Sequence, residues 1–190
     1  MKATVFLFGA GLLAALGFAF YKLSRFDAEE VPYEVRRNDG RFELRNYPAL
    51  AVARTAMRPD RNDSFQRLFD FISGANDRQE KIAMTVPVLF EREPEMMSFF
   101  MPEATKRRGV PQPRTGEIEL GQRPPADVAA VRFRGGMKET GERRAIAELR
   151  EWIRAQHLEP EGEPIIAYYD SPFIPGPLRR NEAMWRVARR

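Results

Sequence analysis

The chain contains no cysteine among its 190 residues and only one histidine, His157. The absence of cysteine excludes disulfide bonds, thiolate metal ligands, a cysteine nucleophile and lipidation at cysteine. With a single histidine, a metal site built from several imidazoles or a histidine triad would need partners of other types. A chain without cysteine is compatible with reducing and with oxidising compartments, so this absence leaves the compartment open.

A strong bias of charge is also absent. The 31 basic and 27 acidic residues leave a net charge of +4, and the two signs are mixed along the chain. Because there is no long basic block or basic and aromatic stripe, we expect no nucleic acid partner. The sequence lacks a glycine-rich phosphate loop, a zinc motif and a nucleophile elbow. We therefore expect no catalytic residues, no metal ligands and a protein that is not an enzyme.

One long apolar run is present, at the N-terminus. Residues 3–21 carry no charge and would span roughly 28 Å as an α-helix, close to the hydrocarbon thickness of a bilayer. Lys2 and Lys22 flank the run, and Tyr21 stands where interfacial aromatic residues are common. We expect residues 1–22 to form a single-pass membrane anchor, with a cleaved signal sequence as the alternative. Basic residues at both ends leave the side of the membrane open.

After this run we expect a charged linker over residues 23–32 and one globular domain over residues 33–190. With 43% apolar and 11% aromatic residues, a domain of this length can build a bulky core.

The pattern of this domain is centred on residues 81–91, where apolar residues occupy both alternating faces. Such a stretch predicts a strand that is buried on both sides. Pro87 has no backbone N–H, so it predicts an edge, a bulge or a bend at that point. We expect this strand and the helix before it to wall any binding site.

Two amphipathic helices are predicted around this strand. The first has Asp63 as its N-cap and Gly74 as its C-cap, and the i, i+3, i+4, i+7 spacing places on one face Phe65, Leu68, Phe69 and Ile72. The second is capped by Thr140, and its apolar face is formed by Ile146, Leu149 and Ile153.

Strands are predicted on either side of both helices. Alternating apolar residues and turn signals place a hairpin with a three-residue turn at 38–40, and further strands at 50–55, 96–101, 118–120, 128–133, 164–169 and 183–187. Residues 103–115 are polar and rich in Pro and Gly, which predicts a long loop. The stretches 31–102 and 116–188 share the order strand, strand, helix, strand, strand. This repeat predicts an α+β domain with mostly antiparallel sheets and two halves related by a pseudo-twofold axis.

Several separated segments resemble the marks of the SOUL heme-binding protein family, in the family's order. They are Asn76-Asp77, Lys81–Val88, Phe100–Pro102, Val110–Pro113, Tyr169–Pro172 and Arg179–Trp185. The resemblance extends from about Tyr33 to Val187. It implies a distorted antiparallel β-barrel of two related halves with two flanking helices, similar to the effector-binding domains of multidrug-sensing transcription regulators.

The resemblance also implies noncatalytic binding of heme or a related tetrapyrrole in an apolar groove beside the first helix. Carried onto this sequence, the groove is lined by Phe65, Leu68, Phe69 and Ile72 and covered by Phe173-Ile174-Pro175. A flat macrocycle gains most from burying its faces on apolar and aromatic surface. Its propionates need cations, for which the candidates are Arg67, Lys81, Arg179 and Arg180. Asp70 stands where some members have a lysine.

No fixed axial ligand is implied for an iron atom. Met84, Met97 and Met101 are expected to fill gaps in the core, and His157 is expected to have a surface or capping role. Three alternatives remain: a binding module for another flat hydrophobic ligand, a tetrapyrrole-modifying enzyme and a scaffold for partner proteins. If the N-terminal anchor holds the domain at a membrane, the protein would act there as a carrier, buffer or sensor of heme.

Overall fold

The computed structural model describes residues 28–189 except residues 59, 137–138 and 172–173. The predicted membrane anchor therefore lies outside the described residues, and so does Phe173 of the expected groove cover. Within the described part of the chain, no helix is both long and apolar enough to cross a membrane.

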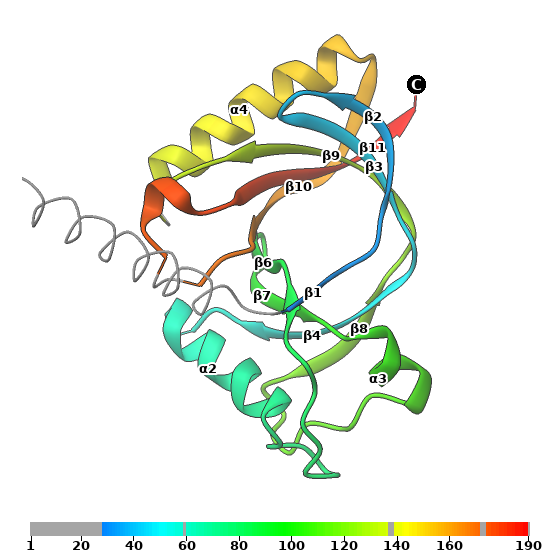
Figure 1. The fold of residues 1–190 in the computed structure, drawn as a ribbon, viewed down its shortest axis with the longest axis vertical. Coiled ribbons are helices and arrows are strands. Elements are labelled where there is room, and N and C mark those ends of the chain that lie inside the picture. Colours follow the sequence, from blue (N-terminus) through cyan, green and yellow to red (C-terminus); the bar gives the residue numbers. More distant parts are fainter. Residues whose placement is uncertain (1–27, 59, 137–138, 172–173, 190) are drawn as a thin grey trace, which may run out of the picture.

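One curved, antiparallel sheet of nine strands dominates the fold (Figure 1). In spatial order its strands are β2 (Glu34–Asp39), β3 (Phe42–Tyr47), β9 (Ala126–Phe133), β11 (Asn181–Arg189), β10 (Leu158–Tyr168), β6 (Val88–Arg92), β7 (Glu95–Phe100), β4 (Leu50–Ala56) and β8 (Glu119–Arg123). The other described elements are the parallel pair β1 (Glu29–Glu30) and β5 (Thr85–Val86), the helices α2 (Arg61–Ile72), α3 (Glu103–Arg108) and α4 (Glu139–Ala155), and the short 3₁₀ helix η1 (Gly176–Leu178). The predicted α+β class is confirmed.

The sheet is open, so the expected β-barrel is wrong. Its edge strands β2 and β8 each have one neighbour among the described residues, β3 and β4 respectively. β8 and β9 follow one another in the chain, but β9 pairs with β3 and β11 instead of β8. Pro124 and Pro125 lie between them and lack the N–H groups that a continuing ladder requires. The chain therefore leaves one edge of the sheet and re-enters it elsewhere.

The strand order shows the internal repeat that the sequence pattern predicts. In one half, β4 is followed by α2 and then by the pair β6 and β7; in the other, β9 is followed by α4 and then by β10 and β11. The halves meet where β6 pairs with β10. Each half also pairs with a strand from the other half's stretch of sequence. β8, which precedes β9 in the chain, pairs with β4 of the first half, and β3, which precedes β4, pairs with β9 of the second half. This exchange joins the two halves into one domain.

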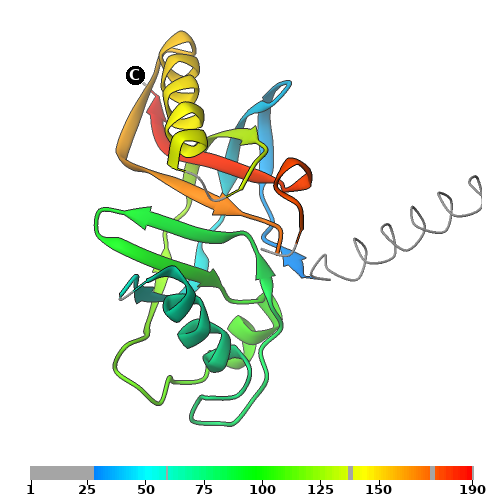
Figure 2. The same ribbon diagram turned by 90° about the vertical axis from the view of Figure 1, so that its left-hand side faces the viewer.

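Both long helices lie on the same face of the sheet, one over each half (Figure 2). α2 packs on β4 and β7, whereas α4 packs on β9, β10 and β11. One core cluster lies between these helices and the sheet, and it includes Leu68, Phe71, Leu149 and Ile153. A second cluster without helix residues covers the opposite face of the sheet. β6, at which the two halves of the sheet meet, therefore lies between the two helices.

α2 begins earlier than the sequence pattern predicts. Its N-cap is Asp60 instead of Asp63, and the Asp60 side chain accepts hydrogen bonds from the backbone N–H groups of Asn62 (2.7 Å) and Asp63 (3.0 Å). The first helical turn is polar, so the apolar periodicity does not reveal it. At the other end, Gly74 lies one residue beyond the observed C-cap and has a φ of +120°, as a glycine stop requires.

Two further predictions about helices are wrong. Residues 103–115 were expected to form a loop, but they begin with α3. Glu103 lies in its first turn and Lys106 in its last, so the charges complement the helix dipole although the segment is polar throughout. Thr140 was expected to cap α4, but it lies inside that helix, which is assigned from Glu139.

The central apolar segment is interrupted at Pro87, as its missing N–H predicts. β5 ends before this residue and β6 begins after it, so the single strand expected over residues 81–91 is wrong. Burial on both faces is confirmed. Leu89 belongs to the cluster on the helix-free face, whereas Val88 and Phe90 belong to the cluster beneath the helices.

The predicted hairpin is formed by β2 and β3 with a connection of two residues instead of three. Asp39 pairs with Phe42 in the ladder, which leaves Gly40 and Arg41 as the turn. Gly40 has a φ of +71°, a conformation that two-residue hairpin turns commonly require.

Candidate functional site

An apolar cleft of about 330 Å³ lies beside the start of α2, on the face of the sheet that carries the helices. Its lining comes from α2, the β5–β6 segment, β7 and the end of β10, and consists of Arg61, Asn62, Phe65, Gln66, Met84, Val86, Val88, Phe90, Met97, Tyr168, Tyr169, Asp170 and Ser171. The volume falls at the lower end of the range for ligand pockets, roughly 300–1,000 Å³. The cleft forms here because α2 and α4 cover separate halves of the sheet and β6, where the halves meet, lies between them.

Aromatic contacts hold the walls of this cleft in place. The ring of Phe65 lies edge-on to Phe99, with 5.3 Å between centroids, and stacks on Phe69 at 5.9 Å. Across the cleft, Phe90 and Tyr168 make a perpendicular contact at 4.8 Å. Rings fixed in this way present apolar surface that favours a ligand with broad apolar faces.

A polar cluster lies beside Tyr168. The Tyr168 hydroxyl donates a hydrogen bond to Glu142, a buried residue of α4. Glu142 also pairs with Arg92 at 2.7 Å and with Arg61 at 3.5 Å, so it connects the start of α4 to the start of α2. Burial and the hydrogen bond to Glu142 raise the pKa of Tyr168 above its usual value. The phenol is therefore protonated at neutral pH, and Arg61 supplies positive charge in the cleft wall.

Tyr169, also in the wall, is held from behind by a buried ionic network. Its hydroxyl donates to Glu182 at 2.8 Å, and Glu182 accepts two hydrogen bonds from Arg45, at 2.6 and 3.0 Å. Arg45 also pairs with Glu43 at 2.7 Å and lies 4.3 Å from the ring centre of Tyr33. Burial acts to raise the pKa of Glu182, but the bonds from Arg45 outweigh it and lower that pKa. Glu182 and Arg45 thus remain ionised, and their contacts fix the position of Tyr169.

Residues of the predicted linker brace the same wall. Glu30 of β1 accepts hydrogen bonds from Arg180 at 2.8 and 2.9 Å, and the Arg180 guanidinium lies 3.7 Å from the ring centre of Tyr169. The N–H of Val31 donates to the carbonyl of Val86 at 3.1 Å, next to the pairing of β1 with β5. The segment just after residue 28 is therefore part of the folded domain. It contacts the cleft residue Val86 directly and reaches Tyr169 through Arg180.

The predicted apolar lining is divided between the cleft and the core. Phe65 lines the cleft. Leu68 and Ile72 are buried beneath α2, with 0% and 5% of their surface exposed, and Phe69 is exposed at the surface, outside the lining. Ile174, predicted to cover the groove, is also buried in the protein. Whether any of these residues contacts a ligand stays a prediction.

The predicted cations lie outside the cleft. Arg67 is directed to β4, where it donates to the carbonyl of Ala56 at 2.6 Å and to the hydroxyl of Thr55 at 3.2 Å. Lys81 does not line the cleft, and Arg179 and Arg180 line a different groove. The cation in the lining is Arg61, which the sequence pattern does not predict as a site residue. With Asp63 as the predicted N-cap, Arg61 would lie outside the helix. Asp60, which is also a good N-cap residue, is the signal that could have placed Arg61 in the helix.

Two of the methionines considered as iron ligands lie in the cleft wall, and the histidine does not. Met84 is half-buried and Met97 fully buried there, whereas Met101 lies in the core away from the cleft. His157 is exposed, has a φ of +55°, and its N–H donates to the carbonyl of Arg154 at 3.1 Å. It thus forms the turn after α4, in agreement with the predicted surface or capping role.

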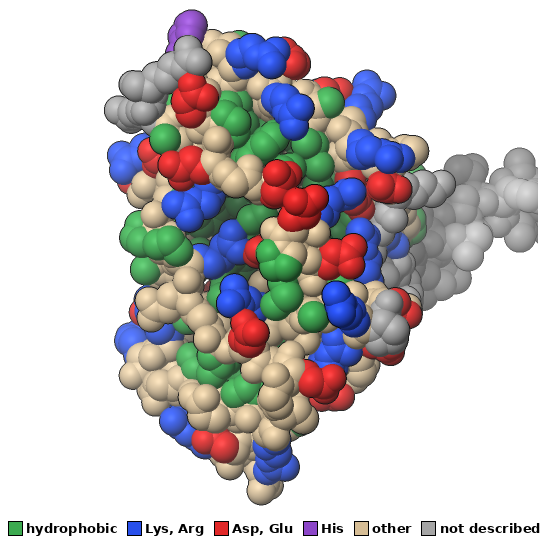
Figure 3. Space-filling view, turned by 180° about the vertical axis from the view of Figure 1, so that it is seen from behind, with side chains coloured by type: hydrophobic (Ala, Val, Ile, Leu, Met, Phe, Trp, Pro, Cys, Tyr) green, Lys and Arg blue, Asp and Glu red, His purple; other side chains and the backbone are tan. Residues whose placement is uncertain are grey.

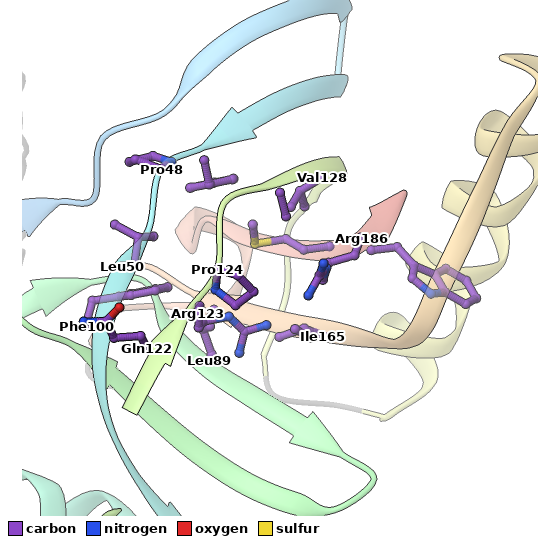
Figure 4. Close-up of a pocket in the computed structure, with 14 residues that line it drawn as sticks. Pro48, Leu50, Leu89, Phe100, Gln122, Arg123, Pro124, Val128, Ile165 and Arg186 are labelled. Atoms are coloured by element: carbon purple, nitrogen blue, oxygen red, sulfur yellow. The ribbon is translucent and has the colours of Figure 1, made fainter. Parts of the chain in front are cut away.

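A second, smaller cavity of about 220 Å³ lies on the helix-free face, between the β8–β9 connection and β10 (Figure 4). Leu50, Leu89 and Phe100 supply apolar walls, and Arg123 and Arg186 supply charge. These two arginines are matched by carboxylates, because Arg123 pairs with Glu91 and Arg186 pairs with Glu161. The view of the molecule from behind likewise shows acidic and basic side chains interspersed (Figure 3). The cleft beside α2 is the better candidate because it is larger and more apolar.

The sequence of this chain matches a known protein family. The sequence model of the SOUL heme-binding protein family matches residues 28–186. No curated protein matches the chain. Among solved structures, the C-terminal domain of EcmrR has a TM-score of 0.56 at 15% identity, over 83% of this chain and 99% of that one. A hydrolase from Listeria innocua has a TM-score of 0.54 at 12% identity, over 88% and 98%. At these identities the structural similarity is evidence for the fold alone.

Proposed function

The chain belongs to the SOUL heme-binding protein family, and we propose that the cleft beside α2 binds heme or a related tetrapyrrole without catalysing a reaction on it. The observation that carries this proposal is the aromatic and aliphatic lining beside β6, the strand at which the two halves of the sheet meet. Such a surface suits the flat apolar faces of a macrocycle. The cleft is open on one side, which would leave an edge of the ligand in water.

Charge in the cleft supports the same proposal. The propionates of a heme need cations at the solvent edge of their site, and the Arg61 side chain is 41% exposed. Its guanidinium lies 5.1 Å from the ring centre of Phe90, so a cation and an apolar wall stand side by side. Because the Tyr168 phenol is protonated, we do not assign it as an iron ligand. Contact with the faces of the macrocycle would then supply most of the affinity.

Phe65→Ala is expected to weaken hemin binding about tenfold or more, because a buried phenylalanine side chain contributes roughly 1.5–3 kcal/mol. The measurement is a titration of the full chain with hemin, followed by the Soret absorbance. Phe69→Ala is the matched control, since the two rings stack on each other but only Phe65 lines the cleft. Thermal melts of both variants check the fold. An equal loss of affinity in the two variants would place the site elsewhere.

The proposed setting is a membrane surface, where the protein would act as a carrier, buffer or sensor of heme. This rests on the apolar run at residues 3–21, from which only residues 22–28 separate β1. These few residues span at most about 25 Å when fully extended, so a membrane anchor would hold the cleft close to the bilayer. A lipophilic ligand would meet the cleft there at raised local concentration.

The full chain is therefore expected to remain in the membrane fraction after extraction with alkaline carbonate. A chain that lacks residues 2–22 should be released to the supernatant, because the predicted anchor is removed and no helix within residues 28–189, as far as they are described, is long and apolar enough to span the bilayer. Immunoblots of the two fractions measure the distribution. Release of the full chain by carbonate would remove the basis for a membrane anchor.

A further inference from the structure

A wide groove of about 900 Å³ lies between the first half of α4 and the η1 turn, elements that Figure 1 shows beside one another. It shares no lining residue with the tetrapyrrole cleft. Among the residues that line it, one is acidic, Glu148, and six are arginines: Arg41, Arg132, Arg134, Arg144, Arg179 and Arg180. We call this feature the arginine groove.

One wall of the arginine groove, η1, is held by close contacts with the end of β9. The N–H of Gly135, at the end of β9, donates to the carbonyl of Gly176 in η1 at 3.0 Å. The side chain of Asn181 donates to the carbonyl of Gly135 at 2.9 Å. A Cβ atom on Gly176 would lie only 3.0 Å from the backbone nitrogen of Gly136, so a larger residue would separate these two segments. The η1 wall of the groove is thus held tightly against the end of β9.

Two of the arginines share a single carboxylate. Arg41 donates to Glu148 at 2.7 Å, and Arg144 donates to the other oxygen of the same carboxylate at 3.0 Å. Burial acts to raise the pKa of Glu148, but the hydrogen bonds from Arg144 and Arg41 outweigh it and lower that pKa. Glu148 is therefore ionised at neutral pH. Even so, the three groups together keep one positive charge.

Arg134 adds a further positive charge. Its side chain is exposed. Within the described ranges it donates one long hydrogen bond, of 3.5 Å, to the carbonyl of Pro177, and it has no carboxylate partner there. By contrast, Arg132 pairs with Glu43 and Glu182. Arg134 and the pair of arginines around Glu148 therefore each contribute positive charge that the described carboxylates do not balance, and all three line the same groove.

We propose that the arginine groove binds a phosphate-bearing anion through Arg134, Arg144 and Arg41. Guanidinium groups present a planar fork of donors that matches phosphate oxygens, and such charge-assisted hydrogen bonds are among the strongest in proteins. Cations from three separate elements, the β2–β3 turn, the end of β9 and α4, line the same groove, so an anion with several oxygens has donors from more than one side. The phosphate could belong to a soluble compound or to a phospholipid headgroup, since both present the same chemistry.

The first test measures binding of inorganic pyrophosphate to the full chain by calorimetry, in an uncharged detergent at low salt. The variant Arg134→Gln with Arg144→Gln should bind about tenfold more weakly or worse, because each substitution removes a charge-assisted hydrogen bond. The matched control, Arg107→Gln with Arg114→Gln, removes the same charge at exposed positions outside the groove and should bind as the wild type does. Higher salt should weaken binding of the wild type, because it screens exposed charges.

A second test separates the two sources of phosphate. Full-length proteins are sedimented with vesicles of phosphatidylcholine alone or of phosphatidylcholine mixed with phosphatidylglycerol. If the mixed vesicles bind more protein than phosphatidylcholine alone, and the groove variant loses this gain while the control keeps it, the ligand is a lipid headgroup. If the groove variant loses affinity for pyrophosphate but shows no difference on the vesicles, the ligand is a soluble compound.

The proposal is overturned if the wild type, the groove variant and the control behave alike in both tests. It is also overturned if the wild type binds neither pyrophosphate nor the anionic vesicles. Hemin titration of the groove variant should match the wild type, because Arg134 and Arg144 do not line the cleft. Failure of the anion proposal and failure of the tetrapyrrole proposal are therefore separate outcomes.

Discussion

Replacing Arg45 by methionine is expected to lower the free energy of unfolding by about 3–5 kcal/mol, the usual cost of removing one partner from a buried ion pair. The Arg45 side chain is 0% exposed and contacts both Glu43 and Glu182. Methionine replaces the aliphatic stem of arginine but carries no charge, so two carboxylates would be left buried without their main partner. Since domains commonly unfold with only about 5–15 kcal/mol, much of the stability would be lost. Urea denaturation of the full-length variants measures the change.

The matched control for this prediction is Arg132→Met. Arg132 pairs with the same two carboxylates, but its side chain is 46% exposed, so water can replace much of what it contributes. The loss should therefore be clearly smaller than for Arg45→Met. Adding Glu182→Gln to Arg45→Met should recover part of the stability, because it removes one orphaned buried charge. An equal loss of unfolding free energy in Arg45→Met and Arg132→Met would contradict the view that burial makes the contacts of Arg45 with Glu43 and Glu182 important for stability.

Met84→Asp is expected to reduce the affinity for hemin at least about a hundredfold. Met84 is half-buried in the wall of the cleft, so an aspartate there is hydrated in the free protein and the fold should tolerate it. A bound macrocycle would remove that water and leave a carboxylate against an apolar face, which costs several kcal/mol. A hundredfold change corresponds to about 2.7 kcal/mol. Titration with hemin, followed by the Soret band, measures the loss.

Two other methionine variants make this test specific. Met96→Asp places the same charge on β7 at a half-buried position outside the cleft, and it should bind hemin as the wild type does. Met84→Leu keeps the apolar surface but removes the sulfur, so it should keep the affinity and the Soret position unless the thioether contacts the iron. Undiminished binding by Met84→Asp would show that the cleft beside α2 is not the site.

The sequence motifs predicted the family, and the repeat of strand and helix signals predicted an α+β domain with two related halves. These predictions depend on local order along the chain, which the fold preserves. The closed barrel failed because strand pairing is a long-range property. Nothing in the apolar pattern around residues 118–133 shows that β9 joins β3 and β11 instead of β8.

Only part of the candidate site was predicted, because local sequence patterns do not show which distant segments come together. Phe65 was found because it belongs to a helical stripe, but Arg61 was missed because the polar first turn of α2 carries no periodic signal. Arg45 and Glu182 are 137 residues apart in sequence, and each reads by itself as an ordinary surface charge. Only strand pairing brings them together beneath Tyr169, so no local pattern could reveal that they stabilise the wall of the cleft.

The sequence by itself determined which face of each element is apolar, because the periods of strands and helices follow from backbone geometry. Phe65 and Leu68 illustrate what it left undecided. They belong to the same stripe of α2, yet Leu68 is sealed against the sheet and Phe65 lines an open cleft. Only the tertiary structure decided this difference, because α2 and α4 cover separate halves of one sheet. An apolar side chain becomes core or binding surface according to what its neighbours cover.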